Sequence, residues 1–225
     1  MTSKIADIRL VASHPEVYEP CDDSFALVDA LLADRMNLLQ LEPTMCLEIG
    51  CGSGYVITSL ALMLGQDTNS SVHCFATDIN PDAVEVTLAT LKAHGVHAEV
   101  MNMDIASALE DRLAGLVDVV VVNPPYVPTP EDEVGAGGIG WLYMLTLAAN
   151  KPSELCGLMR KKGYASKIIV QRSTEEESLH VIKFWRDPDS EVQIKKAMAN
   201  RGSPTSIFSR LSRLSFSGHG NANSK

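Results

Sequence analysis

The stretch TMCLEIGCGSG at residues 44–54 decides the fold of this chain. Its first six residues form a short apolar run, which is typical of a buried strand. Glycines at positions 50, 52 and 54 then permit a tight turn, because glycine adopts backbone conformations that other residues avoid. The apolar segment YVITSLALML (55–64) comes next and predicts a buried helix that stops at Gly65. The stretch therefore predicts a strand, a glycine-rich turn and a helix in succession.

Strands and helices continue to alternate along the chain. We expect a helix over 23–36 with Asp22 or Asp23 as its N-cap, and another that starts at Asn80-Pro81 and ends at Gly95. A short helix is predicted at 107–114 and a longer one at 152–163, and strands are predicted at 44–49, 73–78, 98–104, 117–123, 141–148, 166–172 and 179–185. Apolar strands that alternate with helices indicate an α/β fold, a doubly wound and mostly parallel sheet. The last two strands are joined by a short polar segment, so we expect them to pair antiparallel near the C-terminus.

The composition is that of a globular protein, with 45% hydrophobic and 21% charged residues. The net charge of −9 argues against sequence-independent coating of DNA, which needs a basic face. Residues 187–225 are rich in serine and carry six Lys or Arg against three acidic residues. We therefore expect a folded domain over 1–186 and a disordered basic tail over 187–225.

Other features of the sequence bear on its location. No signal peptide and no apolar run of about 18 residues is visible, so we expect a protein without a membrane span. The five cysteines show no zinc-like spacing, so we expect reduced thiols and no metal site. These features predict a cytoplasmic location and leave the nucleus open as a second one.

Acidic residues stand at the ends of the first three predicted strands of the glycine-rich half, namely Glu48, Asp78 and Asp104. Ligands of open α/β sheets bind outside the carboxyl ends of the strands, so we expect these three side chains to line one crevice. A carboxylate after the second strand can accept both hydroxyls of a ribose, and one after the third can accept from an adenine amino group. The chain has no P-loop, which indicates an adenosine ligand without phosphates. Tyr55 stands where a dinucleotide fingerprint needs glycine, and this disfavours a nicotinamide dehydrogenase.

The tetrapeptide Asn123-Pro124-Pro125-Tyr126 directly follows the most apolar predicted strand. The side-chain oxygen of Asn123 and the backbone carbonyl of Pro124 can each accept one N–H of a planar NH2 group. Pro124 and Pro125 have a fixed φ and hold that carbonyl in place, while Tyr126 can pack on the flat face of the group. A nitrogen held by both of its protons has its lone pair aimed at an electrophile, which is catalysis by positioning. A simple proline turn is the alternative interpretation.

These features together, EIGCGSG (48–54), Asp78, Asp104 and NPPY, resemble the class I S-adenosylmethionine-dependent methyltransferases that modify planar nitrogens. The segment VYEPCDDSF (17–25) narrows the resemblance to the HemK-like group, and within it to the eukaryotic release-factor glutamine methyltransferases. The resemblance covers roughly residues 15–186. It implies S-adenosylmethionine as the cofactor, a class I release factor as the protein substrate and a small zinc-binding activator subunit as a heterodimer partner. It implies that 123–126 hold the target amide and that the cofactor is contacted by Ser24, Glu48, Gly50, Gly52, Asp78, Asp104, Ile105 and Asn123.

The connection after NPPY departs from this resemblance. Only fourteen residues, 127–140, precede the predicted strand at Trp141, and their prolines and glycines disfavour a helix. The HemK-like enzymes have an additional helix here, so we expect that an internal segment is missing between Gly138 and Trp141. The next strand would then arrive by a long hairpin or by an irregular crossover, and one sheet face would lose its cover. The short connection leaves open a shortened inactive form that still binds the cofactor or the activator. An N6-adenine methyltransferase acting on nucleic acid is a second alternative, because NPPY also suits an adenine amino group.

Overall fold

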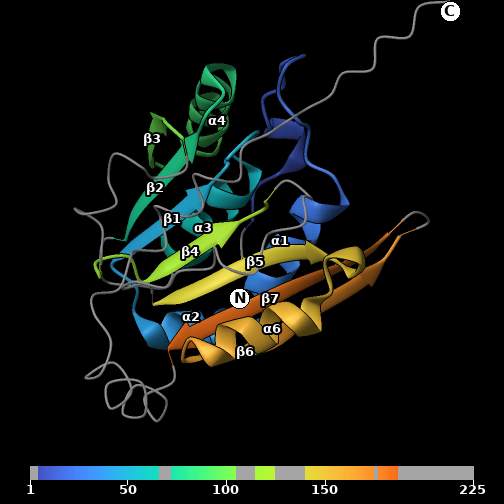
Figure 1. The fold of residues 1–225 in the computed structure, drawn as a ribbon. Helices are drawn as coiled ribbons and strands as arrows, with labels where there is room; N and C mark the ends of the chain where they lie inside the picture. Colours follow the sequence, from blue (N-terminus) through green and yellow to red (C-terminus); the bar gives the residue numbers. More distant parts are fainter. Residues whose placement is uncertain (1–4, 66–71, 105–114, 125–139, 175–176, 187–225) are drawn as a thin grey trace, which may run out of the picture.

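A single seven-stranded sheet forms the centre of the protein in the computed structural model (Figure 1), which describes residues 5–65, 72–104, 115–124, 140–174 and 177–186. The strands lie in the order β3-β2-β1-β4-β5-β7-β6. All neighbours from β3 to β5 pair parallel, and β7 pairs antiparallel with both β5 and β6. This arrangement confirms the predicted sheet and its antiparallel strand. The strands are β1 (Met45–Ile49), β2 (His73–Asp78), β3 (Glu99–Asn102), β4 (Val119–Val122), β5 (Trp141–Leu147), β6 (Tyr164–Ser173) and β7 (Ser178–Arg186).

Helices cover both faces of the sheet. Alternate residues of each strand point to opposite faces, so that Val119 and Val121 of β4 join one apolar cluster while Val120 and Val122 join the other. The first cluster packs against α1, α3 and α4, and the second contains Met159 of α6. The helices are α1 (Asp22–Ala33), α2 (Arg35–Leu41), α3 (Tyr55–Gly65), α4 (Pro81–His94) and α6 (Pro152–Lys161), with 3-10 turns η1 (Ile8–Leu10) and η2 (Ala148–Asn150). None of the helices in these described ranges is long and apolar enough to cross a membrane.

The strand after NPPY arrives parallel to β4, with Val120 opposite Leu142 in the register. The chain therefore takes the crossover route and not the hairpin. The expectation of an uncovered sheet face is wrong for the strands themselves, because Leu47, Val120 and Leu142 on that face are at most 9% exposed. The predicted helix at 107–114, most of the connection 127–140 and the predicted tail 187–225 lie outside the described residues.

The predicted helix over 23–36 differs from the structure at both ends. It begins one residue earlier, with Cys21 as the N-cap in place of Asp22 or Asp23, and it ends at Ala33. Asp34 then separates α1 from α2, a helix that the sequence pattern did not reveal. The break has a tertiary cause, because the Asp34 side chain turns into the core.

Asp34 is the centre of a buried polar network. Its Oδ2 accepts hydrogen bonds from the Tyr143 hydroxyl and the Lys183 ammonium, both at 2.5 Å, and its Oδ1 accepts from Asn37. Burial pushes the pKa of Asp34 upward, but these hydrogen bonds together outweigh it and the pKa is lowered. Burial lowers the pKa of Lys183. The ammonium of Lys183 also lies 3.1 Å from the centroid of the Trp141 ring, so the network joins α1 and α2 to β5 and β7.

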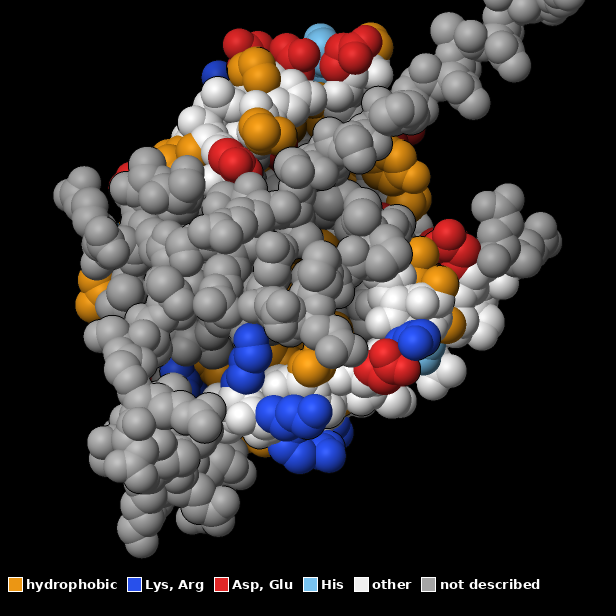
Figure 2. Space-filling view, in the orientation of Figure 1, with side chains coloured by type: hydrophobic (Ala, Val, Ile, Leu, Met, Phe, Trp, Pro, Cys, Tyr) orange, Lys and Arg blue, Asp and Glu red, His pale blue; other side chains and the backbone are white. Residues whose placement is uncertain are grey.

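Charges are separated on the surface. Figure 2 shows Lys and Arg side chains gathered over α6 and the adjoining strand edge, and acidic side chains at the opposite end near α4. The exposed basic residues of this region include Lys151, Arg160, Lys161 and Lys167. Such a distribution orients charged partners as they approach.

Candidate functional site

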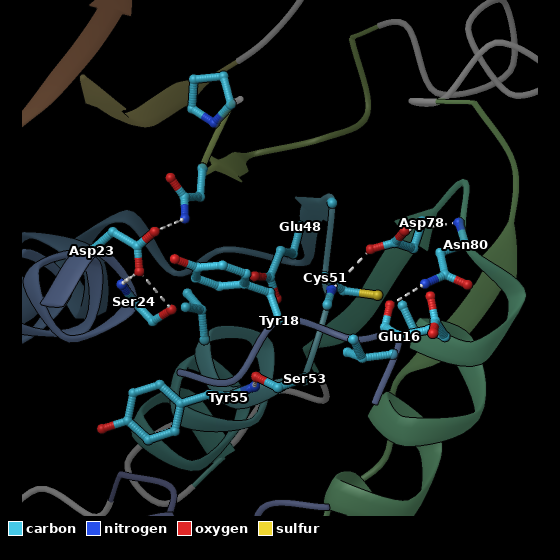
Figure 3. A pocket seen from close by; sticks show the side chains of 17 residues that line it. Glu16, Tyr18, Asp23, Ser24, Glu48, Cys51, Ser53, Tyr55, Asp78 and Asn80 are labelled. Carbon is cyan, nitrogen blue, oxygen red and sulfur yellow. Dashed lines mark hydrogen bonds between the residues drawn. The ribbon is translucent and has the colours of Figure 1, made fainter. Parts of the chain in front are cut away.

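A cavity of about 560 Å³ opens at the carboxyl ends of the parallel strands (Figure 3). This volume lies within the range of sites for small molecules and cofactors. Its walls come from the turns after β1, β2 and β4, from the first turn of α1 and from the segment Glu16–Tyr18. The Asn80 side chain donates a hydrogen bond to the Glu16 carbonyl at 2.8 Å and so holds this segment beside the end of β2.

The glycine-rich turn after β1 forms one wall. Gly50, Gly52 and Gly54 have φ values of 73°, 49° and 75°, a conformation that side chains other than glycine rarely adopt. A Cβ on Gly54 would lie 2.9 Å from the Thr87 Cα of α4, so the turn packs directly against that helix. The Thr87 hydroxyl also donates to the Gly52 carbonyl. The predicted turn is therefore packed closely on α4, and its glycines let the backbone line the cavity together with the side chains of Cys51 and Ser53.

Asp78 lies at the end of β2, where its carboxylate fixes two turns at once. Its Oδ2 accepts from the Gly52 amide at 2.8 Å, and its Oδ1 accepts from the Asn80 amide at 2.9 Å. The side chain is half-buried and lines the cavity. Each carboxylate oxygen can accept more than one hydrogen bond, so Asp78 keeps capacity for hydroxyl donors of a ligand.

Glu48 lies deeper in the same wall and is 4% exposed. Its Oε2 accepts from the Ile57 amide in the first turns of α3 at 2.8 Å. Burial raises the pKa of Glu48 well above its ordinary value, the Ile57 hydrogen bond opposes this shift, and the nearby Asp78 charge adds to it. A cationic ligand in the cavity would stabilise the ionised form of Glu48. Burial also raises the pKa of the Cys51 thiol, which argues against a cysteine nucleophile here.

Asn123 follows β4 and is held by a residue that the sequence did not single out for this role. Its Nδ2 donates to the Asp23 Oδ2 at 2.8 Å, across 100 positions of the chain. Its Oδ1 is buried and has no hydrogen-bond partner among the described residues. Asp23 was expected to cap α1, but its carboxylate is used by this contact, and no local sequence pattern indicates it.

The structure brings most of the predicted site residues together. The cavity wall contains Ser24, Glu48, Gly50, Gly52, Asp78, Asn123 and Pro124. Asp104 is not part of it, because β3 ends at Asn102 and the Asp104 side chain beyond it is exposed. Ile105, Pro125 and Tyr126 lie outside the described residues. The wall also contains residues that the sequence did not indicate for the site, namely Glu16, Val17, Tyr18, Asp23, Cys51, Ser53, Tyr55, Val56, Asn80 and Ala83.

The sheet order, with a cavity at the carboxyl ends of its parallel strands, is that of a class I S-adenosylmethionine-dependent methyltransferase. The residues present fit this cofactor. Asp78 offers carboxylate oxygens for ribose hydroxyls, and the glycine turn leaves room for close approach of the ligand. The buried Glu48 carboxyl suits a ligand that carries positive charge.

Comparisons with known proteins agree with this class. Residues 11–138 match the methyltransferase small domain, and the chain belongs to this family. It is 36% identical to Methyltransferase HEMK2 of Homo sapiens over 199 residues, covering 76% of this chain and 90% of that protein. It is 30% identical to the eRF1 methyltransferase catalytic subunit mtq2 of Schizosaccharomyces pombe over 209 residues, covering 76% and 90%. A release factor glutamine methyltransferase of Chlorobaculum tepidum is 32% identical over 133 residues, covering 52% of this chain and 42% of that protein.

A solved structure shares the fold over 76% of the chain. The E. cuniculi Mtq2–Trm112 complex, described as responsible for methylation of the eRF1 translation termination factor, matches with a TM-score of 0.52 and 25% identity. The match covers 76% of this chain and 99% of that one. The human match has a further property: 76% of 225 residues is about 171, so about 28 of its 199 positions have no residue in this chain.

Proposed function

We propose that this protein transfers a methyl group from S-adenosylmethionine to the side-chain amide nitrogen of a glutamine in a translation release factor. The observation that carries the proposal is the buried Asn123 Oδ1, an acceptor without a partner among the described residues, at the wall of the cofactor cavity. An acceptor in this place suits the N–H of a planar amide. The names of the relatives supply the substrate, since they include a release factor glutamine methyltransferase and an eRF1 methyltransferase subunit.

The residues of the chain act by binding and orientation. Asp78 and the glycine turn hold the adenosine part of the cofactor, and Asn123 accepts one N–H of the substrate amide. Pro124, whose φ is fixed, is suited to present its carbonyl to the other N–H. Bound S-adenosylmethionine supplies an electrophilic methyl group on a positively charged sulfur. Holding both N–H groups of the amide would fix the orientation of its nitrogen, and no nucleophilic side chain of the enzyme is needed.

We further propose that a small zinc-binding activator subunit binds this chain. The support is the structure of Mtq2 in complex with Trm112, together with the family resemblance. The test is transfer of a tritiated methyl group to the release factor, measured with and without the activator. Asn123→Ala should abolish transfer while S-adenosylmethionine still binds, because the lost contact is to the nitrogen that reacts. Asn123→Ala with normal activity would leave NPPY as a turn only.

A second candidate function is favoured by the length of the connection between β4 and β5. After NPPY, the connection has only fourteen residues, 127–140, and a parallel crossover that contains a helix with its flanking loops usually needs more. Over its whole length, the match to the human relative has about 28 positions with no residue in this chain. A shortened form could bind cofactor or activator without transferring methyl groups. Calorimetric titration with S-adenosylmethionine and a transfer assay on the same preparation separate the two functions. Binding without transfer, in the presence of the activator, identifies the inactive form.

A further inference from the structure

We propose that Asp23 is the residue that positions Asn123 for the reaction, by fixing which end of its amide faces the substrate. This inference rests on the proposed function, in which the substrate presents an N–H to Asn123. Asp23 is 6% exposed and lies in the first turn of α1 (Figure 3). Its Oδ2 accepts a hydrogen bond from the Asn123 side-chain Nδ2 at 2.8 Å.

The orientation of Asn123 follows from the chemistry of this contact. An ionised carboxylate only accepts hydrogen bonds, so the NH2 end of Asn123 must face Asp23. The Oδ1 end must then face the other way, where it is buried and has no partner among the described residues. A buried acceptor without a hydrogen-bond partner lowers the stability of the folded protein. Its presence here is explained if an N–H group of the substrate donates a hydrogen bond to it.

The other oxygen of Asp23 is fixed by donors. Its Oδ1 accepts from the Ser24 backbone amide at 2.5 Å, from the Ser24 hydroxyl at 3.1 Å and from the Cys21 thiol at 2.8 Å. Burial and the hydrogen bond to Asp23 raise the pKa of the Cys21 thiol, which keeps it protonated as a donor. Both oxygens of Asp23 therefore act as acceptors, as in an ionised carboxylate. The negative charge of that carboxylate strengthens its hydrogen bond to Asn123.

This arrangement makes Asp23→Asn, which keeps the shape, a sharp test. The donors at Ser24 and Cys21 would hold the carbonyl oxygen of the new amide, so its NH2 would face Asn123. Asn123 would have to turn over, and its own NH2 would then face the substrate N–H, donor against donor. The double variant Asp23→Asn/Asn123→Asp restores an acceptor on the substrate side, because one oxygen of the new carboxylate accepts from residue 23 and the other is free for the substrate.

The first experiment measures methyl transfer to the release factor in the presence of the activator. We expect kcat to fall about 100-fold in Asp23→Asn, the scale of a misplaced reacting group, while the Kd for S-adenosylmethionine changes less than about twofold. The double variant should regain at least about tenfold over Asp23→Asn, a rescue that a purely structural role of Asp23 would not produce. Asp22→Asn is the matched control, since it makes the same change one residue away at an exposed side chain. Wild-type turnover in Asp23→Asn, or a double variant no faster than Asp23→Asn, would overturn the proposal.

The second experiment does not depend on turnover. In the NMR spectrum of the wild-type protein, the Asn123 side-chain amide, assigned by its loss in Asn123→Asp, should show one downfield proton that exchanges slowly with solvent. That proton should move upfield in Asp23→Asn and stay in place in Asp22→Asn. A rapidly exchanging Asn123 amide in the wild type, or one unmoved by Asp23→Asn, overturns the positioning role. If the wild type transfers no methyl group but shows the protected proton, the proposed function fails and the positioning role stands.

Discussion

Asp78→Ala should weaken S-adenosylmethionine binding more than it weakens the fold. The carboxylate of Asp78 lies on the cavity wall and is half-buried, so its loss exposes little apolar surface. Removing it frees the backbone amides of Gly52 and Asn80, which bond it at 2.8 and 2.9 Å. Water can reach these two partly buried amides, so the free energy of unfolding should fall by only about 1–2 kcal/mol.

The loss in cofactor binding is larger, because the ribose hydroxyls lose a carboxylate acceptor on the cavity wall. Charge-assisted hydrogen bonds of this kind are worth about 2–3 kcal/mol, which corresponds to a rise in Kd of about 30- to 150-fold. Asp78→Asn keeps one acceptor oxygen and should show an intermediate loss. Isothermal titration calorimetry with S-adenosylmethionine measures the affinity, and thermal unfolding measures the fold.

Glu85→Ala is the control for the change in net charge, because Glu85 is exposed on α4 and is absent from the cavity wall. It should leave the Kd unchanged. An Asp78→Ala protein that unfolds cooperatively and binds S-adenosylmethionine as tightly as the wild type would refute the assignment of Asp78 to the ribose.

Three further predictions concern stability. Gly54→Ala should lower the free energy of unfolding by about 1–3 kcal/mol in urea titrations, because the φ of Gly54 is 75° and the new Cβ would meet Thr87. Gly157→Ala in α6 is the control: there is open space around Gly157, so this change should not destabilise the protein. Asp34→Asn should cost about 3–5 kcal/mol, since it leaves the Lys183 ammonium buried without its counter-charge. The folded-state pKa of Asp34 is lowered, so its contribution to stability is complete above the ordinary pKa of about 3.9 and is lost as the pH falls through the folded-state pKa. The free energy of unfolding, measured between pH 6 and 2, should therefore depend less on pH in Asp34→Asn than in the wild type. Because the connection after NPPY is short, we expect the chain without the activator to have low stability and to transfer few methyl groups. A monomeric chain that unfolds cooperatively and is fully active without the activator would contradict the hypothesis that a segment is missing.

The parts of the fold that the sequence predicted well are those with local causes. β2 spans 73–78 as expected from its apolar run, and α4 begins after Asn80, whose side chain accepts from the Asp82 amide, and ends at Gly95 with φ 66°. Capping and glycine signals are local, so they can be recognised without knowledge of the partner elements. The break at Asp34 has no local signal, because its cause is Lys183, 149 residues further along the chain. Helix propensity around Asp34 favoured continuation, and the tertiary contact overrode it.

The candidate site divides in the same way. Glu48, Asp78 and Asn123 could be found because each stands at or next to the carboxyl end of a strand of a parallel sheet. Such strand ends meet at one edge of the sheet whatever the details of packing. Asp104 satisfied the same rule only if the third strand extended to it. β3 is an edge strand that ends at Asn102, and Asp104 beyond it is exposed and does not line the cavity.

Asp23 shows why part of the site was beyond reach of the sequence. An aspartate at the start of a helix has a well-founded local role as N-cap, and the residues around Asp23 give no reason to prefer another. In the structure the Asp23 side chain has another role. Asp23 is 6% exposed, and one of its carboxylate oxygens accepts a hydrogen bond from Asn123, which follows a strand 100 positions further along the chain. A buried carboxylate must have its hydrogen bonds completed, and the first helical turn of α1 can do so only on one side, at Ser24 and Cys21. The second oxygen therefore needs a hydrogen-bond donor from elsewhere in the fold. Asn123 supplies it, so the start of α1 is joined to the asparagine that faces the substrate, and the local sequence pattern does not reveal this contact.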